Sequence, residues 1–361
     1  MARAAVLHQV GDKELDLRDD VTTIEPGPAQ VKIKIKATGV CHSDLSSMTG
    51  VLPVMPPTVI GHEGSGVVVE AGDHVTNVKV GDHVVVNWSP DCGYCAECLR
   101  GEPYLCMTFI GEAFSVPRFL LGDGSPAFGM AGVGTWAEEM VVPSQAAIKV
   151  ADDVPFEYAA LLGCGIPTGV GAVFNTAKVT PGAKVAVVGA GGVGLSVIQG
   201  ARIAGASTIL AIDPNEAKHE IAKHFGATHT ATLDNVAETT GLLTGGGFDY
   251  VFEVVGKSAA IQTAWTATRR GGDVIVVGAG AGDDNWTQNA FSLLFDGKSL
   301  KASLYGGCDL KRDVPLFVDL WRAGKLDLES LISRRIKFEE LNDAVEALTG
   351  GDVIRQVVLF D

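Results

Sequence analysis

The stretch Val185-Ala-Val-Val-Gly189-Ala-Gly191-Gly-Val-Gly194-Leu-Ser196 decides the fold of this chain. It has the pattern of a buried strand, a Gly-x-Gly-x-x-Gly turn and the start of a helix. Gly189 permits the tight turn, Gly191 lets the backbone approach a pyrophosphate, and Gly194 allows close packing of helix on strand. The free amides at the helix N-terminus then face the phosphate charge. The stretch therefore predicts a dinucleotide-binding βαβ unit, although a glycine turn that binds nothing has the same pattern.

A carboxylate follows this turn at the distance that a dinucleotide site requires. The next strand-like run, Thr208–Ile212, leads directly into Asp213, about 20 residues beyond the turn. An acidic residue at that place binds the adenosine ribose and repels a 2′-phosphate, so the sequence predicts NAD rather than NADP. Lys218, about one helical turn further, either contacts the ribose or is an ordinary surface lysine.

The pattern of apolar residues changes near residue 153. Before it, short β-type runs such as Val31–Lys36 alternate with period two and are separated by Gly, Pro and Asp. After it, strand-like runs alternate with helical stretches, as in βαβ units around a parallel sheet. The chain has 361 residues, too many for one ordinary core. We therefore predict an α/β protein with a β-rich domain over 1–160, a parallel-sheet domain over 161–302, and a C-terminal segment, 303–361, that returns to the first domain.

The net charge and the hydropathy argue against two classes of partner. The chain carries a net charge of -15, and its 28 Lys and Arg residues are scattered, so a nucleic-acid backbone would be repelled. No apolar run approaches the roughly 20 residues that span a bilayer, and the N-terminus lacks a secretory apolar stretch. These features predict a cytoplasmic protein that binds neither nucleic acid nor membranes.

Four of the seven cysteines lie close together: Cys92, Cys95, Cys98 and Cys106. Thiolates at this spacing form a closed tetrahedral site with no open position, which is the structural type of zinc site. An odd cysteine count without an export signal does not favour disulfides. We predict that zinc holds this loop, about residues 91–107, because the excursion has too little core of its own.

Three further metal-ligand candidates are dispersed along the chain. Cys41 stands in Gly-Val-Cys-His-Ser-Asp, His62 in Gly-His-Glu, and Cys164 in Gly-Cys-Gly. Each alone is typical of a small buried thiol or a core histidine. Together, two cysteines and one histidine make a site with three protein ligands and an open fourth position, as a catalytic zinc requires. The residues alone leave both interpretations open.

Taken in this order, the motifs resemble the zinc-containing medium-chain alcohol dehydrogenase family, in its liver-type form with a longer loop after the four cysteines. The resemblance covers essentially the whole chain, from Gly39–Asp44 through the cysteine loop and the glycine turn to Gly351-Asp-Val-Ile-Arg355. It implies a GroES-like β-rich catalytic domain, a Rossmann coenzyme domain with a doubly wound parallel sheet, NAD, and two zinc ions per subunit. The implied substrate is a small alcohol or aldehyde.

The resemblance also assigns roles to individual residues. Cys41, His62 and Cys164 match the ligands of the catalytic zinc. Glu63 matches a residue that approaches the metal during exchange of its water or alcohol, and Asp44 matches one that orients the zinc histidine. The implied cofactor site comprises the pyrophosphate contacts His42 and Arg355, the nicotinamide neighbours Thr168 and Val193, and Gly189, Gly191, Gly192, Gly194, Asp213, Lys218, Val254 and Val277.

The implied reaction is the reversible oxidation of an alcohol to an aldehyde or ketone. Zinc acts as a Lewis acid on the substrate oxygen, and hydride passes to the nicotinamide. Ser43 matches the hydroxyl that takes the alcohol proton and passes it to the ribose. Liver-type members end this path with a histidine where this chain has Ser46, and we hypothesise that water replaces the histidine.

The residues around the substrate position favour an apolar primary alcohol. Trp88 aligns with the aromatic residue that flanks the reacting carbon, and Leu52 lies in an uncharged loop, Thr49–Met55. Family members that use a glutathione adduct of formaldehyde carry acidic residues in that loop and an arginine where this chain has Ile110. A glutathione adduct is therefore disfavoured, while plain core packing of Trp88 and Leu52 stays open.

The long segment from Cys106 to Ala147 resembles the dimeric members and predicts a homodimer through the edge of the coenzyme-domain sheet. Three other functions stay open: a formaldehyde dehydrogenase that depends on another thiol, a nicotinoprotein that never releases its cofactor, and a non-catalytic structural member of the fold. The last kind tends to lose zinc ligands, whereas all the ligand candidates are present here.

Overall fold

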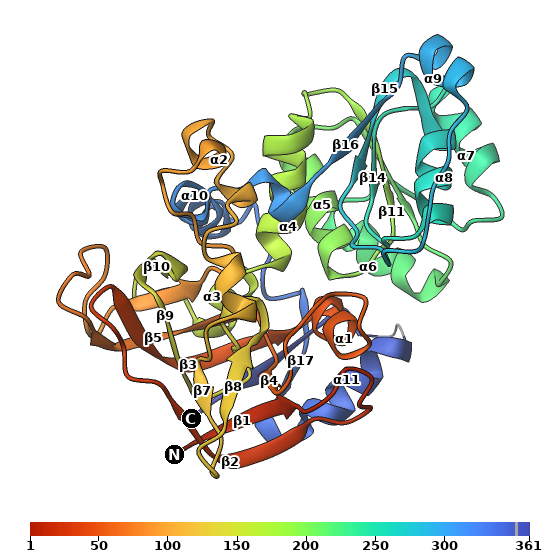
Figure 1. The fold of residues 1–361 in the computed structure, drawn as a ribbon. Helices are drawn as coiled ribbons and strands as arrows, with labels where there is room; N and C mark the ends of the chain where they lie inside the picture. Colours follow the sequence, from red (N-terminus) through yellow and green to blue (C-terminus); the bar gives the residue numbers. More distant parts are fainter. Residues whose placement is uncertain (351–352) are drawn as a thin grey trace. The chain divides into compact units, whose positions relative to one another are not determined.

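The computed structural model describes residues 1–350 and 353–361, and contacts divide it into two compact units (Figure 1). Unit 1 comprises Met1–Cys164, Asp309–Asp319 and Leu328–Asp361, and unit 2 comprises Gly165–Cys308 and Leu320–Asp327. Gly351 and Asp352, with which the last family motif begins, lie outside the described residues.

The units differ from the predicted domain ranges near the C-terminus. Residues 303–308 and Leu320–Asp327 cluster with unit 2, although the sequence prediction placed all of 303–361 with the first domain. The Gln199 side chain accounts for the second segment, because its Nε2 donates to the Asp327 carbonyl and its Oε1 accepts from the Asp327 amide. A helix of unit 2 therefore holds this short piece of the C-terminal chain.

Unit 1 is built from β-strands in two groups. A closed barrel contains, in order of pairing, β1 (Ala2–Leu7), β2 (Asp16–Thr23), β7 (Phe119–Leu120), β8 (Pro126–Gly129) and β4 (Thr58–Val59). The second group is a seven-stranded sheet. Six of its strands follow the order β10 (Ala147–Lys149), β6 (His83–Val86), β5 (Gly64–Ala71), β3 (Gln30–Val40), β18 (Arg355–Leu359) and β17 (Ile332–Ile336), and the seventh strand, β9 (Glu139–Pro143), pairs with β3.

Strand β3 shows how the sequence pattern becomes a core. Val31, Ile33 and Ile35 are fully buried, whereas the intervening Lys32 and Lys34 are half-buried and exposed. This alternation is what a strand with one face on the core requires, and it confirms the predicted period of two.

Short helices complete unit 1. The α-helices are α1 (His42–Met48), α2 (Ala96–Leu99), α3 (Phe156–Leu161), α10 (Leu310–Arg322), whose last residues belong to unit 2, and α11 (Leu341–Gly350). Single 3₁₀ turns connect the strands: η1 (Pro103–Leu105), η2 (Ile110–Phe114), η3 (Met130–Gly132), η4 (Ser144–Ala146) and η8 (Phe338–Glu340).

Unit 2 is a parallel sheet in the doubly wound order that the glycine turn predicts. Every pair of neighbouring strands is parallel, and the order reverses between β11 and β14. In open α/β sheets, ligands bind outside the carboxyl ends of the strands at such a reversal. The order is β13 (His229–Ala231), β12 (Thr208–Ile212), β11 (Lys184–Val188), β14 (Phe248–Glu253), β15 (Thr268–Val276) and β16 (Ser299–Ala302).

The helices of unit 2 include the one that follows the glycine turn, α5 (Gly192–Ile203), which is buried along most of its length. A Cβ on Gly194 would overlap the Gly189 carbonyl, so only glycine allows this helix to start so close to β11. The other helices are α4 (Gly165–Gly171), the π-helix η5 (Ala172–Ala177), η6 (Glu216–Lys218), α6 (His219–Phe225), α7 (Val236–Thr244), α8 (Ser258–Ala267), α9 (Ala290–Asp296) and η7 (Leu304–Gly307). Among the described residues, no helix is both long and apolar enough to cross a membrane.

Candidate metal centres and cofactor site

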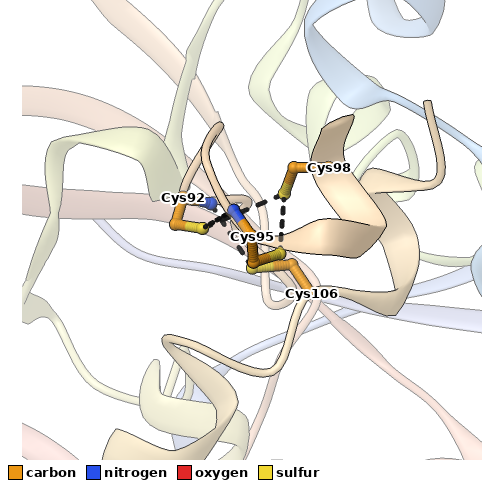
Figure 2. Close-up of side chains that lie close together, drawn as sticks. All are labelled: Cys92, Cys95, Cys98 and Cys106. Atoms are coloured by element: carbon orange, nitrogen blue, oxygen red, sulfur yellow. Dashed lines mark hydrogen bonds between the residues drawn. The ribbon is translucent and has the colours of Figure 1, made fainter. Parts of the chain in front are cut away.

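The four clustered cysteines converge on one point in a loop of unit 1. Figure 2 shows their sulfur atoms facing one another, and all four lie within 4.8 Å of each other. The Sγ atoms of Cys95 and Cys98 are 3.4 Å apart, and those of Cys92 and Cys98 are 4.0 Å apart. None of these cysteines forms a disulfide. Four free thiols at such distances form the donor set of a closed tetrahedral zinc site.

The electrostatics of this loop favour a thiolate at Cys92, whereas the pKa values of Cys95 and Cys98 are raised. Desolvation raises the pKa of Cys92, but hydrogen bonds from Thr108 and from the amides of Tyr94 and Cys95 outweigh it and bring the pKa to about 6. The loop has little core of its own, since Tyr94 and Leu99 are 72% and 76% exposed. A metal bound by the four sulfurs would therefore supply most of the cohesion of this segment.

The second centre brings together the three dispersed candidates. Cys41 immediately precedes α1, His62 lies between β4 and β5, and Cys164 lies between α3 and α4. All three are buried, and their ligand atoms lie within 4.8 Å of one another. The fold of unit 1 thus joins residues that are far apart in sequence into one site.

Asp44 connects two members of this site. Its Oδ1 lies 2.8 Å from the Nδ1 of His62, and its Oδ2 accepts a hydrogen bond of 2.8 Å from the Cys41 amide. The His62 Nδ1 therefore carries the proton that is donated to Asp44, which leaves a lone pair on Nε2. This Nε2 is buried and has no hydrogen-bond partner in the described chain. An unpartnered lone pair beside two thiols is the arrangement of a metal ligand.

The charges around the site also fit a divalent cation. Glu63 is fully buried, and its Oε2 accepts a hydrogen bond of 3.0 Å from the Nη1 of Arg355. A hydrogen bond between the thiols of Cys41 and Cys164, together with the positive charge of Arg355, holds the pKa of Cys41 well below its ordinary value. The same hydrogen bond, together with burial, raises the pKa of Cys164. Thiolates at Cys41 and Cys164 would add two negative charges to those of Asp44 and Glu63. A cation bound by the two sulfurs would offset this accumulated negative charge. The residues therefore fit zinc.

Other predicted residues of unit 1 lie near this cluster. The Oγ of Ser43 is 3.9 Å from the Cys41 Sγ. The ring of Trp88 packs edge-on against His62 with 6.5 Å between ring centroids. Leu52 is half-buried, and its amide donates to the Ser46 carbonyl at 3.0 Å. The structure therefore places Ser43 and Trp88 at the metal centre and ties the loop that carries Leu52 to α1.

The predicted dinucleotide residues of unit 2 gather at the carboxyl ends of its strands. Gly189 has a φ of +102°, which other residues rarely adopt. Asp213 accepts a hydrogen bond of 2.9 Å from the Ala190 amide within the glycine turn. The Nζ of Lys218 lies 3.7 Å from the Asp213 carboxylate. The carboxylate thus lies beside the turn, as a ribose-binding residue requires.

The remaining predicted cofactor residues lie on neighbouring elements. Thr168 is in α4, Val193 is in α5, the Val254 amide donates to the Val188 carbonyl, and the Val277 amide donates to the Glu253 carbonyl. His42 and Arg355 belong to unit 1. Their contacts with the pyrophosphate stay a prediction. The structure also shows an ion pair between Arg355 and Glu63 that neither local sequence indicates.

Comparisons with known proteins agree with this geometry. Residues 27–152 match the family model of the alcohol dehydrogenase GroES-like domain, and residues 192–322 match that of zinc-binding dehydrogenases. The chain is 38% identical to S-(hydroxymethyl)glutathione dehydrogenase of Paracoccus denitrificans and 38% identical to alcohol dehydrogenase class-3 of Cereibacter sphaeroides, with 99% of each chain covered in both cases.

A solved structure shows the same architecture. Benzyl alcohol dehydrogenase of Acinetobacter calcoaceticus superposes with a TM-score of 0.93 at 32% identity, covering 100% of this chain and 99% of that one. The chain therefore belongs to the zinc-dependent alcohol dehydrogenase family, with a GroES-like domain and a Rossmann domain. It is accordingly an oxidoreductase that depends on zinc and NAD.

Proposed function

We propose that the enzyme oxidises an apolar primary alcohol, with an aromatic alcohol such as benzyl alcohol as its best substrate. The observation that carries the proposal is the indole of Trp88, whose centroid lies 6.5 Å from that of the ligand His62. The loop Thr49–Met55 adds an uncharged segment in which Val51 and Met55 are partly exposed. The similar structure named as a benzyl alcohol dehydrogenase supports the same class.

In this proposal each residue of the metal centre has a physical task. Cys41, His62 and Cys164 hold zinc, which when bound supplies Lewis-acid polarisation of the substrate oxygen. Asp44 keeps the His62 tautomer fixed, because its carboxylate accepts the Nδ1 proton. Ser43, beside Cys41, takes the proton from the alcohol hydroxyl.

Substitution of Trp88 tests the substrate class. Trp88→Ala should lower kcat/KM for benzyl alcohol about ten- to hundredfold. The reason is that burying the indole against the ring of the bound alcohol contributes about 1.5–3 kcal/mol. Turnover of ethanol, which is too small to fill the same space, should change less. Equal losses for both alcohols would show that Trp88 is a packing residue, and the substrate proposal would then fail.

A glutathione adduct of formaldehyde is the second candidate, because two relatives carry the names S-(hydroxymethyl)glutathione dehydrogenase and class-3 alcohol dehydrogenase. Against it, the loop Thr49–Met55 holds no carboxylate, and Ile110 in η2 is apolar. Formaldehyde turnover with glutathione, with another small thiol and with no thiol separates the candidates. Formaldehyde turnover that requires a thiol, at a kcat/KM above that for benzyl alcohol, would overturn the assignment.

We propose that NAD and NADH exchange between the enzyme and solution, whereas a nicotinoprotein keeps its cofactor permanently bound. The purified enzyme should lose nicotinamide absorbance on gel filtration and should respond to added NAD. Absorbance that survives gel filtration, together with turnover that ignores added NAD, would instead identify a permanently bound cofactor.

We infer that the proton leaves Ser43 through water rather than through a second imidazole. Ser46, in α1, is half-buried and stands where liver-type members carry the relay histidine. Ser46→His should therefore change the pH dependence of kcat. An unchanged profile would mean that residue 46 is not on the proton path.

We also propose a homodimer through the edge of the sheet in unit 2. Among the described strands, β16 ends the sheet order and pairs with β15 alone. Leu300 of β16 and Phe291 and Leu294 of the neighbouring α9 are 46%, 69% and 76% exposed. A second copy that pairs at this edge would cover both the free strand and the apolar side chains.

A charge on the proposed interface tests the dimer. Leu294→Glu should shift the mass measured by light scattering from two chains to one. Leu242→Glu on α7 is the matched control, since Leu242 is 79% exposed and lies on another helix. A wild-type protein that runs as a monomer would contradict the proposal. The predicted cytoplasmic location stays a prediction.

A further inference from the structure

A buried glutamate stands at the point where the strand order of unit 2 reverses. Glu253 is the last residue of β14, and its backbone pairs in register with Val188, the last residue of β11. The glycine turn begins at the next residue, Gly189. Dinucleotides bind outside the carboxyl ends of strands at such a reversal. Glu253 therefore lies at the edge of the sheet where proteins of this topology bind a dinucleotide in a crevice, although no motif in the sequence singled it out.

Glu253 fixes two loops that border this crevice. Its Oε1 accepts hydrogen bonds from the amides of Val255 and Gly256, each 2.7 Å long. Its main-chain carbonyl accepts from the amides of Val277 and Gly278 at 2.8 and 3.1 Å. We call residues 254–256 the crevice turn. The side chain of Glu253 holds this turn, and the carbonyl holds the loop that follows β15.

The crevice turn lies close to Ala279 on one side and to Gly189 on the other. Gly256 has a φ of +78°, and a Cβ there would overlap the backbone of Ala279. On the other side, a Cβ on Gly189 would meet a Val255 methyl group at 2.9 Å. A shift of the crevice turn toward Gly189 would therefore displace the start of the glycine turn, in which Gly191 lets the backbone approach the pyrophosphate.

The carboxyl group is costly to keep in this place. Glu253 is fully buried, and its Oε2 has no hydrogen-bond partner among the described residues. Burial raises the pKa of Glu253, and the turn amides offset only part of that effect. Burial of a carboxyl group destabilises a fold unless its oxygens are hydrogen-bonded, so the bonds from the Val255 and Gly256 amides matter for this residue.

We propose that Glu253 is a positioning residue for NAD, which fixes the crevice turn so that the glycine turn keeps the shape that binds the dinucleotide. The proposal rests on the NAD dependence of the enzyme. It assigns no contact between the carboxylate and the reacting atoms. Its prediction is that removing the acceptor weakens NAD binding more than it weakens the fold.

The test compares three variants by direct measurement of NADH dissociation constants, from fluorescence titration without substrate. Glu253→Ala removes the acceptor, and Glu253→Gln keeps an oxygen for the two amides. Asp249→Ala is the matched control, because Asp249 accepts the Lys184 amide at 2.8 Å near the opposite end of the same strand. Melting temperatures without cofactor report the stability of each variant.

We expect Glu253→Ala to raise the NADH dissociation constant about tenfold, which corresponds to about 1.4 kcal/mol. The Gln variant should bind NADH like the wild type, and Asp249→Ala should lose stability without losing NADH affinity. The apparent KM for NAD should rise in Glu253→Ala while kcat at saturating NAD changes little. If Glu253→Ala does not fold, Glu253→Asp, whose shorter side chain withdraws the oxygen from the turn, should show the same loss of affinity.

Two results would overturn the proposal. Wild-type NADH affinity in the folded Ala or Asp variant would show that Glu253 serves the fold alone. An equal loss of affinity in Asp249→Ala would show that any weakening of β14 has the same effect. A wild-type protein that binds no NADH would instead contradict the assigned cofactor, so the two failures are distinguishable.

Discussion

The carboxylate of Asp44 offers the sharpest test of the catalytic metal centre. It contacts two of the three ligand residues, through the His62 Nδ1 and the Cys41 amide, each at 2.8 Å. Asp44→Ala removes both contacts and leaves the three ligand side chains in place. The substitution therefore probes how the site is held rather than which atoms bind the metal.

The expected loss follows from these two contacts. Each buried donor left without a partner costs about 1–3 kcal/mol. The loss of a group that orients a metal ligand weakens metal binding about 10–100-fold in other proteins, which corresponds to about 1.4–2.7 kcal/mol. The two estimates overlap, so we expect Asp44→Ala to bind zinc at this site about 10–100-fold more weakly.

Competition with a chromogenic chelator measures the effect, with zinc content determined by mass spectrometry. The four-cysteine centre serves as an internal standard, because the Asp44 carboxylate contacts His62 and Cys41 of the other centre. The zinc of the four-cysteine centre should therefore be retained. Asp82→Ala is the control, since Asp82 is also a buried carboxylate of unit 1 that accepts a backbone amide, at 3.0 Å from Lys79. Wild-type resistance of both zinc ions to the chelator in Asp44→Ala would refute the role assigned to the carboxylate.

Three further predictions concern other parts of the chain. Cys98→Ser should cost one zinc ion per chain and a metal-binding free energy on the order of 10 kcal/mol, so limited proteolysis should cut the cysteine loop while the rest stays intact. Asp213→Ser should raise kcat/KM with NADP about tenfold, as removal of a repulsive charge worth about 1.4 kcal/mol allows. The hydrogen bond to Glu329 raises the pKa of Tyr158 from 10.0 to about 12. The contribution of this hydrogen bond to the free energy of unfolding is therefore complete below pH 10.0 and is lost as the pH rises to about 12. Tyr158→Phe should therefore flatten the decline of the unfolding free energy in urea over that range.

Local spacing was sufficient to predict two of the three sites. The glycine turn and Asp213 are separated by one helix and one strand, so their relation follows from the geometry of a single βαβ unit. The four cysteines share one loop, and their distance in space is bounded by their distance along the chain. Both predictions needed no knowledge of how distant segments meet.

The catalytic centre could not be predicted in that way. Cys41, His62 and Cys164 lie on segments that only the assembled fold of unit 1 brings together. Each residue alone has the pattern of ordinary core packing. The resemblance to a known family was therefore required to join them, and the structure then showed the same three residues within ligand distance.

Long-range polar pairs were missed altogether. Arg355 and Glu63 are 292 positions apart and meet in the core of unit 1, and nothing in either local sequence marks the partner. Glu253 ends an apolar strand, where an acidic residue looks like an ordinary strand terminus. Its hydrogen bonds to the next turn depend on the path of that turn, which the sequence pattern does not specify.

The central claim is that the centre of Cys41, His62 and Cys164 holds the zinc on which alcohol oxidation depends. Cys41→Ser, purified beside the wild type, tests it by zinc content, NADH affinity and NADH formation from benzyl alcohol. We predict that the variant keeps the zinc of the four-cysteine loop, loses the other zinc, binds NADH like the wild type and forms no NADH. Loss of that zinc with undiminished NADH formation would contradict the account.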